Sequence, residues 1–238
     1  MNDYQASKDL LSGRVILVTG ASAGIGRAAA LAYAAHGATV VLLGRRLPEL
    51  EQVYDEITAQ GYATPAIMTL DLSMAGSHEC QQVAEAIETS LGRLDGVLHN
   101  AAVLGDITPL EMYDPDTWDF VMKINLRAPF VLTQALLPLL KQSDDASIIM
   151  TSSSVGRRAR AFWGAYAISK CGIEGMVQML ADELAVIPRS ILNALIGMHH
   201  QALRIASCQQ RRLQSIAHQV TVNAIAHLPA DYLAAVQI

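Results

Sequence analysis

The chain has 238 residues, 52% of them hydrophobic, and a net charge of -5, a size that suits one α/β domain with a single large core. Without a lysine- or arginine-rich run, this charge argues against nucleic acid or an anionic membrane as a partner. Three cysteines without metal-ligand spacing, a polar amino terminus and the lack of an apolar run of about 18 residues predict a cytoplasmic protein with no metal site and no membrane contact.

The amino-terminal part has the pattern of a strand, a glycine-rich turn and a helix. Residues 15–18 are apolar, and residues 27–35 form an alanine-rich helical stretch. Glycines allow the backbone to approach a pyrophosphate, and a helix N-terminus supplies unpaired N–H groups for it. A second apolar run at 39–43 completes the spacing of a βαβ unit. We therefore predict a dinucleotide site that includes Gly20, Ser22, Gly24, Ile25 and Gly26.

The second predicted strand ends in Gly44-Arg45-Arg46. An NAD site would usually place a carboxylate here to bind the ribose 2′-hydroxyl. Because the carboxylate is missing, Arg45 is expected to pair with a 2′-phosphate, which favours NADP(H) and leaves NAD(H) as the second choice. The alternative is a solvated arginine pair.

A predicted helix at 47–60 and a third strand at 66–70 lead to Asp71 and Leu72, both assigned to the cofactor site. The carboxylate of Asp71 either accepts a hydrogen bond from an adenine amino group or caps the segment after Ser73.

Another predicted helix at 78–91 precedes a strand at 96–99. Asn100 and Ala101 follow its carboxyl end, where ligands of open α/β sheets bind, and join the predicted cofactor site. The alternation of strands and helices predicts the α/β class: a Rossmann-like, doubly wound parallel sheet with helices on both faces, in three layers α/β/α.

Residues 116–141 have the apolar spacing of one long helix, interrupted by Pro129. Proline lacks the N–H that would bond the carbonyl of Asn125, four residues earlier. A carbonyl freed in this way could hold a water that connects Lys170 to solvent as a proton path. An ordinary proline kink beside a buried asparagine is the alternative.

The chemical centre is expected between Ser152 and Glu183. Helical spacing from Ala165 onward puts Tyr166 and Lys170 at i and i+4, on one face. A nearby ammonium is expected to lower the pKa of the phenol toward the working range of an acid-base catalyst, and Ser153 could donate a hydrogen bond to a substrate oxygen. An exposed helix pair is the alternative.

Together the glycine turn, Asp71, Asn100-Ala101, Asn125, Ser153 and Tyr166-x-x-x-Lys170 resemble the short-chain dehydrogenase/reductase family, from about residue 12 to 187. The resemblance implies hydride transfer between NAD(P)(H) and a small carbonyl or alcohol substrate. It also implies a catalytic set of Asn125, Ser153, Tyr166 and Lys170. In this set Tyr166 is the general acid/base, Ser153 polarises the substrate oxygen and Asn125 holds the relay water. Lys170 lowers the Tyr166 pKa and holds the nicotinamide ribose, so Tyr166 and Lys170 also contact the cofactor.

Two further features bear on substrate and assembly. Arg157, Arg158 and Arg160 precede Tyr166 and suggest an anionic substrate, with a solvated loop as the alternative.

Small residues in the helix that carries Tyr166 suit close helix approach, and the family commonly pairs subunits through this helix, so a homodimer or homotetramer is expected. These small residues are Ala165, Ala167, Ser169, Gly172 and Gly175.

The chain is expected to form one NAD(P)-binding domain over 1–238, family-like over 1–187 and atypical over 188–238. The family's sixth strand has two candidates, at 192–197 and 220–226. The tail is either a rearranged or frame-altered terminus, or a variant in which residues 201–216 form a covering helix and residues 220–225 the last strand. Two functions follow: an active NADP(H)-dependent oxidoreductase, or a cofactor-binding protein with impaired catalysis.

Overall fold

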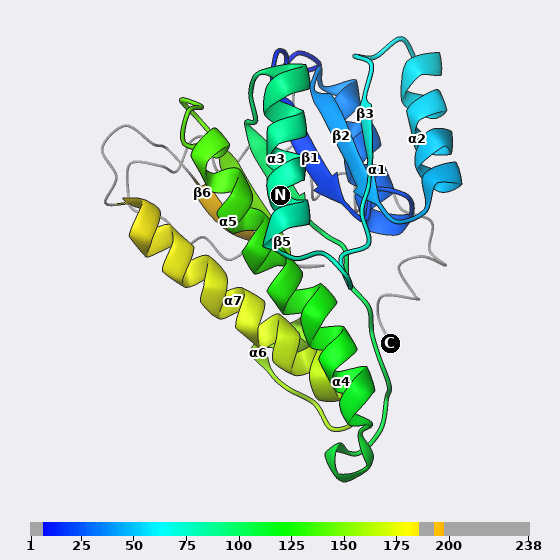
Figure 1. Ribbon diagram of the computed structural model, residues 1–238, viewed down its shortest axis with the longest axis vertical. Helices are drawn as coiled ribbons and strands as arrows, with labels where there is room; N and C mark the ends of the chain where they lie inside the picture. Colours follow the sequence, from blue (N-terminus) through cyan, green and yellow to red (C-terminus); the bar gives the residue numbers. More distant parts are fainter. Residues whose placement is uncertain (1–6, 186–192, 198–238) are drawn as a thin grey trace.

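Six parallel strands form one sheet in the part of the chain that the structure describes (Figure 1). The computed structural model describes residues 7–185 and 193–197. The strand order is β3-β2-β1-β4-β5-β6, which is the order of a doubly wound dinucleotide-binding sheet. The strands are β1 (Val15–Thr19), β2 (Thr39–Gly44), β3 (Ala66–Thr69), β4 (Gly96–His99), β5 (Ser147–Thr151) and β6 (Asn193–Gly197). The predicted α/β architecture is confirmed.

Helices connect the strands and cover both faces of the sheet (Figure 1). The α-helices are α1 (Gly24–Ala35), α2 (Leu47–Ala59), α3 (Ser77–Leu91), α4 (Pro115–Met122), α5 (Ala128–Leu140), α6 (Ser154–Arg157) and α7 (Gly164–Ala185). A 3-10 turn, η1 (Leu110–Met112), and a π-helical segment, η2 (Lys123–Arg127), complete the described helices. Neither η1 nor α6 was predicted from the sequence.

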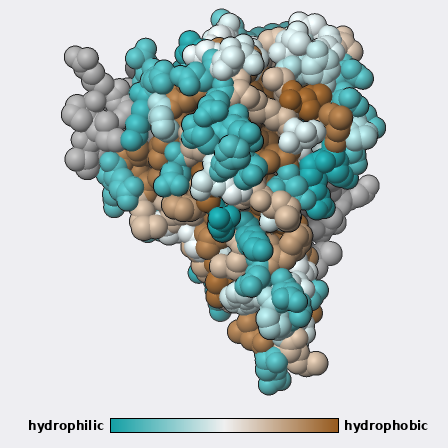
Figure 2. Space-filling view, in the orientation of Figure 1, coloured by the Kyte–Doolittle hydropathy of each residue, from teal (hydrophilic) through white to brown (hydrophobic). Residues whose placement is uncertain are grey.

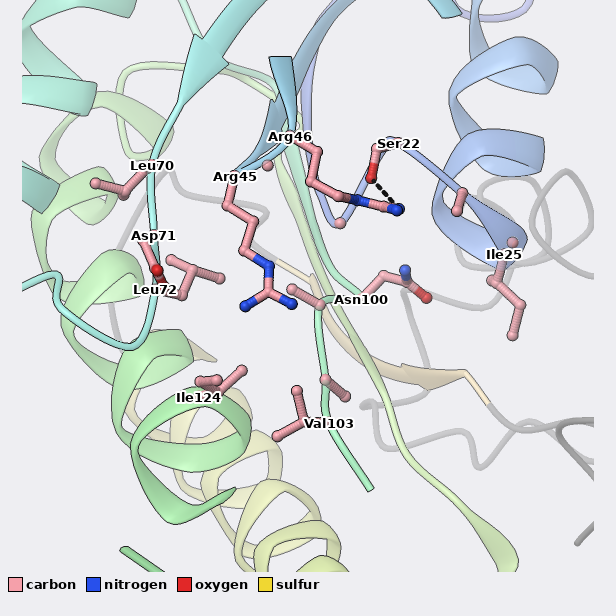
Figure 3. A pocket seen from close by; sticks show the side chains of 16 residues that line it. Ser22, Ile25, Arg45, Arg46, Leu70, Asp71, Leu72, Asn100, Val103 and Ile124 are labelled. Atoms are coloured by element: carbon pink, nitrogen blue, oxygen red, sulfur yellow. Dashed lines mark hydrogen bonds between the residues drawn. The ribbon is translucent and has the colours of Figure 1, made fainter. Parts of the chain in front are cut away.

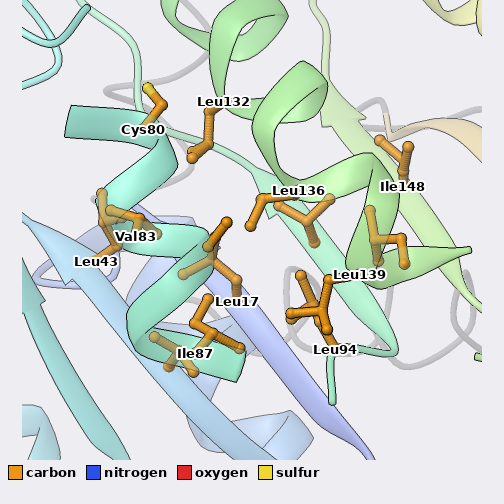
Figure 4. Close-up of a cluster of buried hydrophobic side chains, with 14 of the residues drawn as sticks. Leu17, Leu43, Cys80, Val83, Ile87, Leu94, Leu132, Leu136, Leu139 and Ile148 are labelled. Carbon is orange, nitrogen blue, oxygen red and sulfur yellow. The ribbon is translucent and has the colours of Figure 1, made fainter. Parts of the chain in front are cut away.

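Two apolar cores result, one on each face of the sheet. Leu17 of β1 packs under α3, α5 and α7, whereas its neighbour Val18 packs under α1 and α2. Both side chains are fully buried, because successive residues of a strand point to opposite faces and helices cover both. Figure 4 shows the first core, in which Leu132 and Leu136 of α5 meet Val83 and other side chains of α3 and β1.

The long helix predicted at 116–141 is interrupted differently from the expectation. Instead of a kink at Pro129, the structure has α4, the π-helical η2 and then α5, with Pro129 in the first turn of α5. The Ala128 N–H donates to the carbonyl of Lys123, five residues earlier, as the wider π turn requires. Pro138, inside α5, does not end that helix.

The first of the two candidate strands in the tail is confirmed. Residues 193–197 form β6, which pairs in parallel with β5 in a register that aligns Ile149 with Leu195. The second candidate at 220–226, the alternative last strand at 220–225 and the covering helix expected at 201–216 lie outside the described residues.

The surface carries hydrophobic patches between broad hydrophilic areas, and some lie on the tapering lower end of the view in Figure 2. The loop between β4 and α4 exposes large apolar side chains, namely Leu104, Ile107, Leu110 and Met112. Among the described helices, none has the length and the apolar character needed to cross a membrane.

Candidate functional site

A cavity of about 390 Å³ opens at the carboxyl ends of β1, β2 and β4 (Figure 3). A volume of this size suits a small-molecule or cofactor site. Most of the residues predicted to bind the cofactor line it: Gly20, Ser22, Gly24, Ile25, Arg45, Asp71, Leu72, Asn100 and Ala101. Gly26, Tyr166 and Lys170 do not. Arg46, Val103 and Ile124 line it as well, and sequence reasoning missed them.

The glycine turn brings backbone against backbone at the base of the cavity. Gly20 has a φ of +67°, and a Cβ there would lie 3.0 Å from the Cα of Ala101. A Cβ at Gly26 would overlap the carbonyl oxygen of Gly20 and lie 2.8 Å from Nδ2 of Asn100. Gly26 therefore acts beneath the cavity, by allowing α1 to begin close to the turn.

The N-terminus of α1 is open to a ligand. Its N-cap residue, Ala23, makes no side-chain capping hydrogen bond, and the first turn contains no acidic residue. The first N–H groups of a helix have no partner inside the helix, so an anion can accept hydrogen bonds from them here.

Thr19 connects the ends of β1 and β4. Its buried hydroxyl oxygen accepts hydrogen bonds from the backbone N–H groups of Asn100 and Ala101, at 3.0 and 3.1 Å. The bonds fix the segment after β4 against the glycine turn. The sequence analysis assigned no role to Thr19; a hydroxyl residue directly after an apolar strand is the signal that could have indicated it.

Two arginines form one wall of the cavity. In Figure 3 the Arg45 guanidinium points into the cavity, between Leu72 and Asn100, whereas Arg46 turns toward Ser22. Arg46 donates to the Ser22 hydroxyl at 3.2 Å and forms an ion pair with Glu49 at 3.0 Å. Of the two arginines, Arg45 is therefore the one whose side chain points into the cavity.

Asp71 caps a turn, as one of its two predicted roles required. Its Oδ1 accepts from the Ser73 N–H at 2.9 Å and from the Ser73 hydroxyl at 2.7 Å. These hydrogen bonds hold the pKa of the Asp71 carboxyl below its ordinary value, and the charge of Arg45 lowers it further. Because Asp71 also lines the cavity, its contact with an adenine stays a prediction.

Tyr166, Lys170 and Ser153 come together beside the end of β5. Lys170 Nζ lies 5.6 Å from the centroid of the Tyr166 ring and donates to the Thr151 carbonyl at 2.7 Å. The Ser153 side chain forms a hydrogen bond with the Tyr166 phenol. Ser153 also begins α6 as its N-cap, with its oxygen 3.5 Å from the Val155 N–H.

The pKa of Tyr166 differs from the prediction. Burial raises the pKa of the phenol above its ordinary value, and the hydrogen bond from Ser153 offsets part of that rise. Lys170 was expected to lower the Tyr166 pKa, whereas the pKa of Tyr166 follows from burial and from Ser153. Burial also acts on Lys170 itself and lowers its pKa to about 8. The sequence indicated that the two residues share a face, but not that Lys170 is buried and Tyr166 half-buried.

Asn125 lies in η2 and is buried, and its side chain connects the cavity to α7. Its Oδ1 accepts from the Val103 N–H at 2.8 Å, and its Nδ2 donates to the Val103 carbonyl at 2.8 Å and to the Ser169 hydroxyl at 3.2 Å. Ser169 in turn donates to the Tyr166 carbonyl at 2.8 Å. The predicted relay water through the Asn125 carbonyl stays a prediction.

A second connection runs through β5. The Thr151 hydroxyl lies 3.4 Å from Oδ1 of Asn100, which lines the cavity, and the Thr151 carbonyl binds Lys170. The four predicted catalytic residues thus form one cluster, which hydrogen bonds tie to the cavity wall at Val103 and Asn100.

His99 precedes Asn100 and is buried at the end of β4. One ring nitrogen, Nε2, lies 2.9 Å from the Thr133 hydroxyl of α5. Burial lowers the pKa of His99 to about 4, so the ring is neutral at pH 7. Its role is packing and hydrogen bonding rather than acid-base chemistry.

One expectation about α7 needs correction. Ala165, Ala167 and Ser169 are buried within this chain, so they are not on its surface to meet a partner. The arginines before Tyr166 fit the solvated-loop alternative: Arg157, Arg158 and Arg160 are all exposed, and Arg157, in α6, also lies 3.7 Å from Glu174. Among the described residues there is no cluster of His, Cys, Asp or Glu that could hold a metal ion.

Comparisons with known proteins match both sequence and fold. A family model described as short chain dehydrogenase matches residues 14–191, ending close to the predicted boundary at 187. Over 180 residues the chain is 55% identical to the uncharacterised oxidoreductase YciK of Escherichia coli K12, covering 76% of this chain and 71% of that one.

Solved structures of similar proteins agree in fold. A short chain dehydrogenase from Pseudomonas syringae superposes with a TM-score of 0.79 at 53% identity, covering 82% of this chain and 79% of that chain. A short chain dehydrogenase from Escherichia coli CFT073, solved with NADPH, gives a TM-score of 0.76 at 51% identity, with 81% and 80% covered.

Proposed function

Because the chain belongs to the short chain dehydrogenase family and is an oxidoreductase of that family, we propose that it is NADP(H)-dependent and acts on a carbonyl or a secondary alcohol. The observation that carries the proposal is one continuous arrangement. A half-buried phenol, Tyr166, lies with Lys170 and Ser153, and Asn125 joins this cluster to the wall of the glycine-rich cavity.

The residues of the cavity fit a phosphorylated dinucleotide. The close backbone approach at Gly20 and Gly26 and the uncapped start of α1 suit a pyrophosphate. Arg45, directed into the cavity, would pair with a 2′-phosphate, which supports NADP(H) over NAD(H). The NADPH in the similar Escherichia coli CFT073 protein supports the same cofactor here.

When bound, the nicotinamide would supply or accept the hydride, so the protein would have to orient the substrate and manage one proton. In the direction of reduction, Tyr166 donates its phenolic proton to the substrate oxygen; a phenol is protonated at neutral pH, and burial raises its pKa further. Ser153 shares a hydrogen bond with the phenol and would orient the same substrate oxygen. Lys170 stays beside the phenol because the Thr151 carbonyl holds its ammonium group.

We also propose that the chain forms one domain over 1–238 and that it assembles with a second copy of itself. A groove between α4, η2, α5 and α7 is lined by Phe130, Met176, Met179 and other residues, and it exposes half of the Phe130 side chain. In this groove Gly172 and Met176, rather than the buried small residues of α7, would meet the partner. The test is the molar mass in solution.

The function is tested by fluorescence titration with NADPH and NADH, followed by a panel of an aromatic aldehyde, a cyclic ketone, a β-keto ester and an α-diketone. We expect tighter binding of NADPH and its oxidation by at least one compound. NADPH binding without oxidation across the panel would favour a cofactor-binding protein without turnover.

A further inference from the structure

Three consecutive residues at the end of β5 each contact α7. The Thr151 carbonyl accepts from Lys170, and Ser153 hydrogen-bonds to Tyr166. The residue between them, Ser152, points its hydroxyl at α7 as well, and this third contact has no part in the proposed chemistry.

The partner of Ser152 is Glu174. The Ser152 hydroxyl donates to Glu174 Oε1 at 2.8 Å, and the same oxygen lies 3.7 Å from Nε of Arg157 in α6. The Glu174 side chain is only 12% exposed and Ser152 is buried. Glu174 follows Lys170 by one helical turn, as Lys170 follows Tyr166, so the three lie on one face of α7.

The fit between α6 and α7 is close. A Cβ at Gly156 would lie 2.9 Å from the Ser152 hydroxyl oxygen and 3.0 Å from the Lys170 backbone. The Cys171 thiol lies 2.8 Å from the Gly156 carbonyl oxygen. A shift of α6 away from α7 would therefore move Ser153, its N-cap residue, relative to Tyr166.

We propose that Glu174 is a positioning residue that holds Ser153 within hydrogen-bonding distance of Tyr166. It does so by anchoring Ser152 directly and α6 through Arg157. The inference rests on the proposed function, in which Ser153 and Tyr166 act on one substrate oxygen. The Ser152 hydrogen bond is the main contact, because at 3.7 Å the part-exposed Arg157 pair is weak.

The first test does not depend on activity. Hydrogen exchange of the backbone amides at 152–158 is followed by mass spectrometry in the wild-type protein and in Glu174→Ala, with Glu183→Ala, an exposed position of α7, as control. We expect about tenfold faster exchange at 152–158 in Glu174→Ala, with β1 unchanged, and no change in the control. Unchanged exchange at 152–158 would overturn the proposal.

The second test separates positioning from a general structural role. With NADPH and the best carbonyl compound of the panel, Glu174→Ala should lower kcat by about 10- to 100-fold without changing the NADPH affinity. Glu174→Gln keeps an acceptor for Ser152 and should restore kcat to within about threefold of wild type. In a Ser153→Ala background, Glu174→Ala should cost less than about twofold, because the residue that it positions is gone.

An equal loss of kcat in both backgrounds would overturn the proposal. If the wild-type protein oxidises NADPH with no compound of the panel, the proposed function fails. The exchange experiment then decides the role of Glu174 alone.

Discussion

The side-chain amide of Asn125 and the backbone of Val103 form a pair of hydrogen bonds, each 2.8 Å long. Val103 lines the cavity, and Asn125 also contacts Ser169 of α7. This pair, together with the Asn125–Ser169 hydrogen bond, therefore connects the wall of the cavity to α7, the helix that carries Tyr166.

Replacing Asn125 should loosen that connection. In Asn125→Ala the Val103 N–H and carbonyl lose their partners, so we expect a loss of about 1–3 kcal/mol in the free energy of unfolding and weaker NADPH binding. Urea denaturation and fluorescence titration measure the two effects. Gln52→Ala, an exposed glutamine of α2, is the control and should change neither. Unaltered stability in Asn125→Ala would contradict the structural role.

Arg45 should decide between the two cofactors. Arg45→Ala is expected to weaken NADPH binding by about 10- to 100-fold, the value of a charge-assisted hydrogen bond, and to leave NADH binding unchanged. Arg46→Ala is the matched comparison, and its effect should be smaller because Arg46 already pairs with Glu49 and Ser22. Dissociation constants of both cofactors provide the measurement. Equal losses for NADPH and NADH in Arg45→Ala would refute the assignment.

Two glycine substitutions should have opposite effects on stability. Gly26→Ala places a Cβ against the Gly20 carbonyl, so we expect a loss of about 1–3 kcal/mol and of cofactor binding. Gly175 lies within α7 and has no atom within 4 Å of its Cβ position. Gly175→Ala should stabilise the protein by about 0.5–1 kcal/mol. Thermal denaturation compares them, and a neutral Gly26→Ala would show that the turn has room.

The buried Lys170 predicts how stability changes with pH. Burial lowers its pKa from 10.5 to about 8, so between these values the unfolded chain binds more protons on this group than the native protein does. Stability contributed by this group must therefore rise with pH in that window. From pH 7 to 9.5 the wild type should gain roughly 2 kcal/mol relative to Lys170→Met. Urea denaturation at several pH values measures this gain, and parallel curves would rule out a lowered pKa.

The sheet could be predicted because its strands are buried on both faces. Val15–Val18 and Val40–Leu43 are continuous apolar runs, and each is followed by a turn and then by the apolar spacing of a helix. Local patterns of this kind predict a parallel sheet with right-handed crossovers, whereas the strand order comes from the structure. The predicted bounds accordingly differ from the observed ones by only a few residues.

The site was predicted less completely, because its details depend on contacts between distant segments. The helical spacing placed Tyr166 and Lys170 on one face, but their pKa values follow from burial that a linear pattern does not reveal. The role of Thr19 depends on a bond to a residue 81 positions away. The π turn before Pro129 likewise has no counterpart in the apolar spacing.

The central claim is that the phenol of Tyr166 handles the proton of a hydride-transfer reaction. The most direct test is the rate of NADPH oxidation by wild type and Tyr166→Phe with the best compound of the carbonyl panel. We predict that Tyr166→Phe binds NADPH with wild-type affinity and loses about 10²- to 10⁴-fold in kcat. If Tyr166→Phe oxidised NADPH as fast as wild type, the phenol would not be the acid and the account would be wrong.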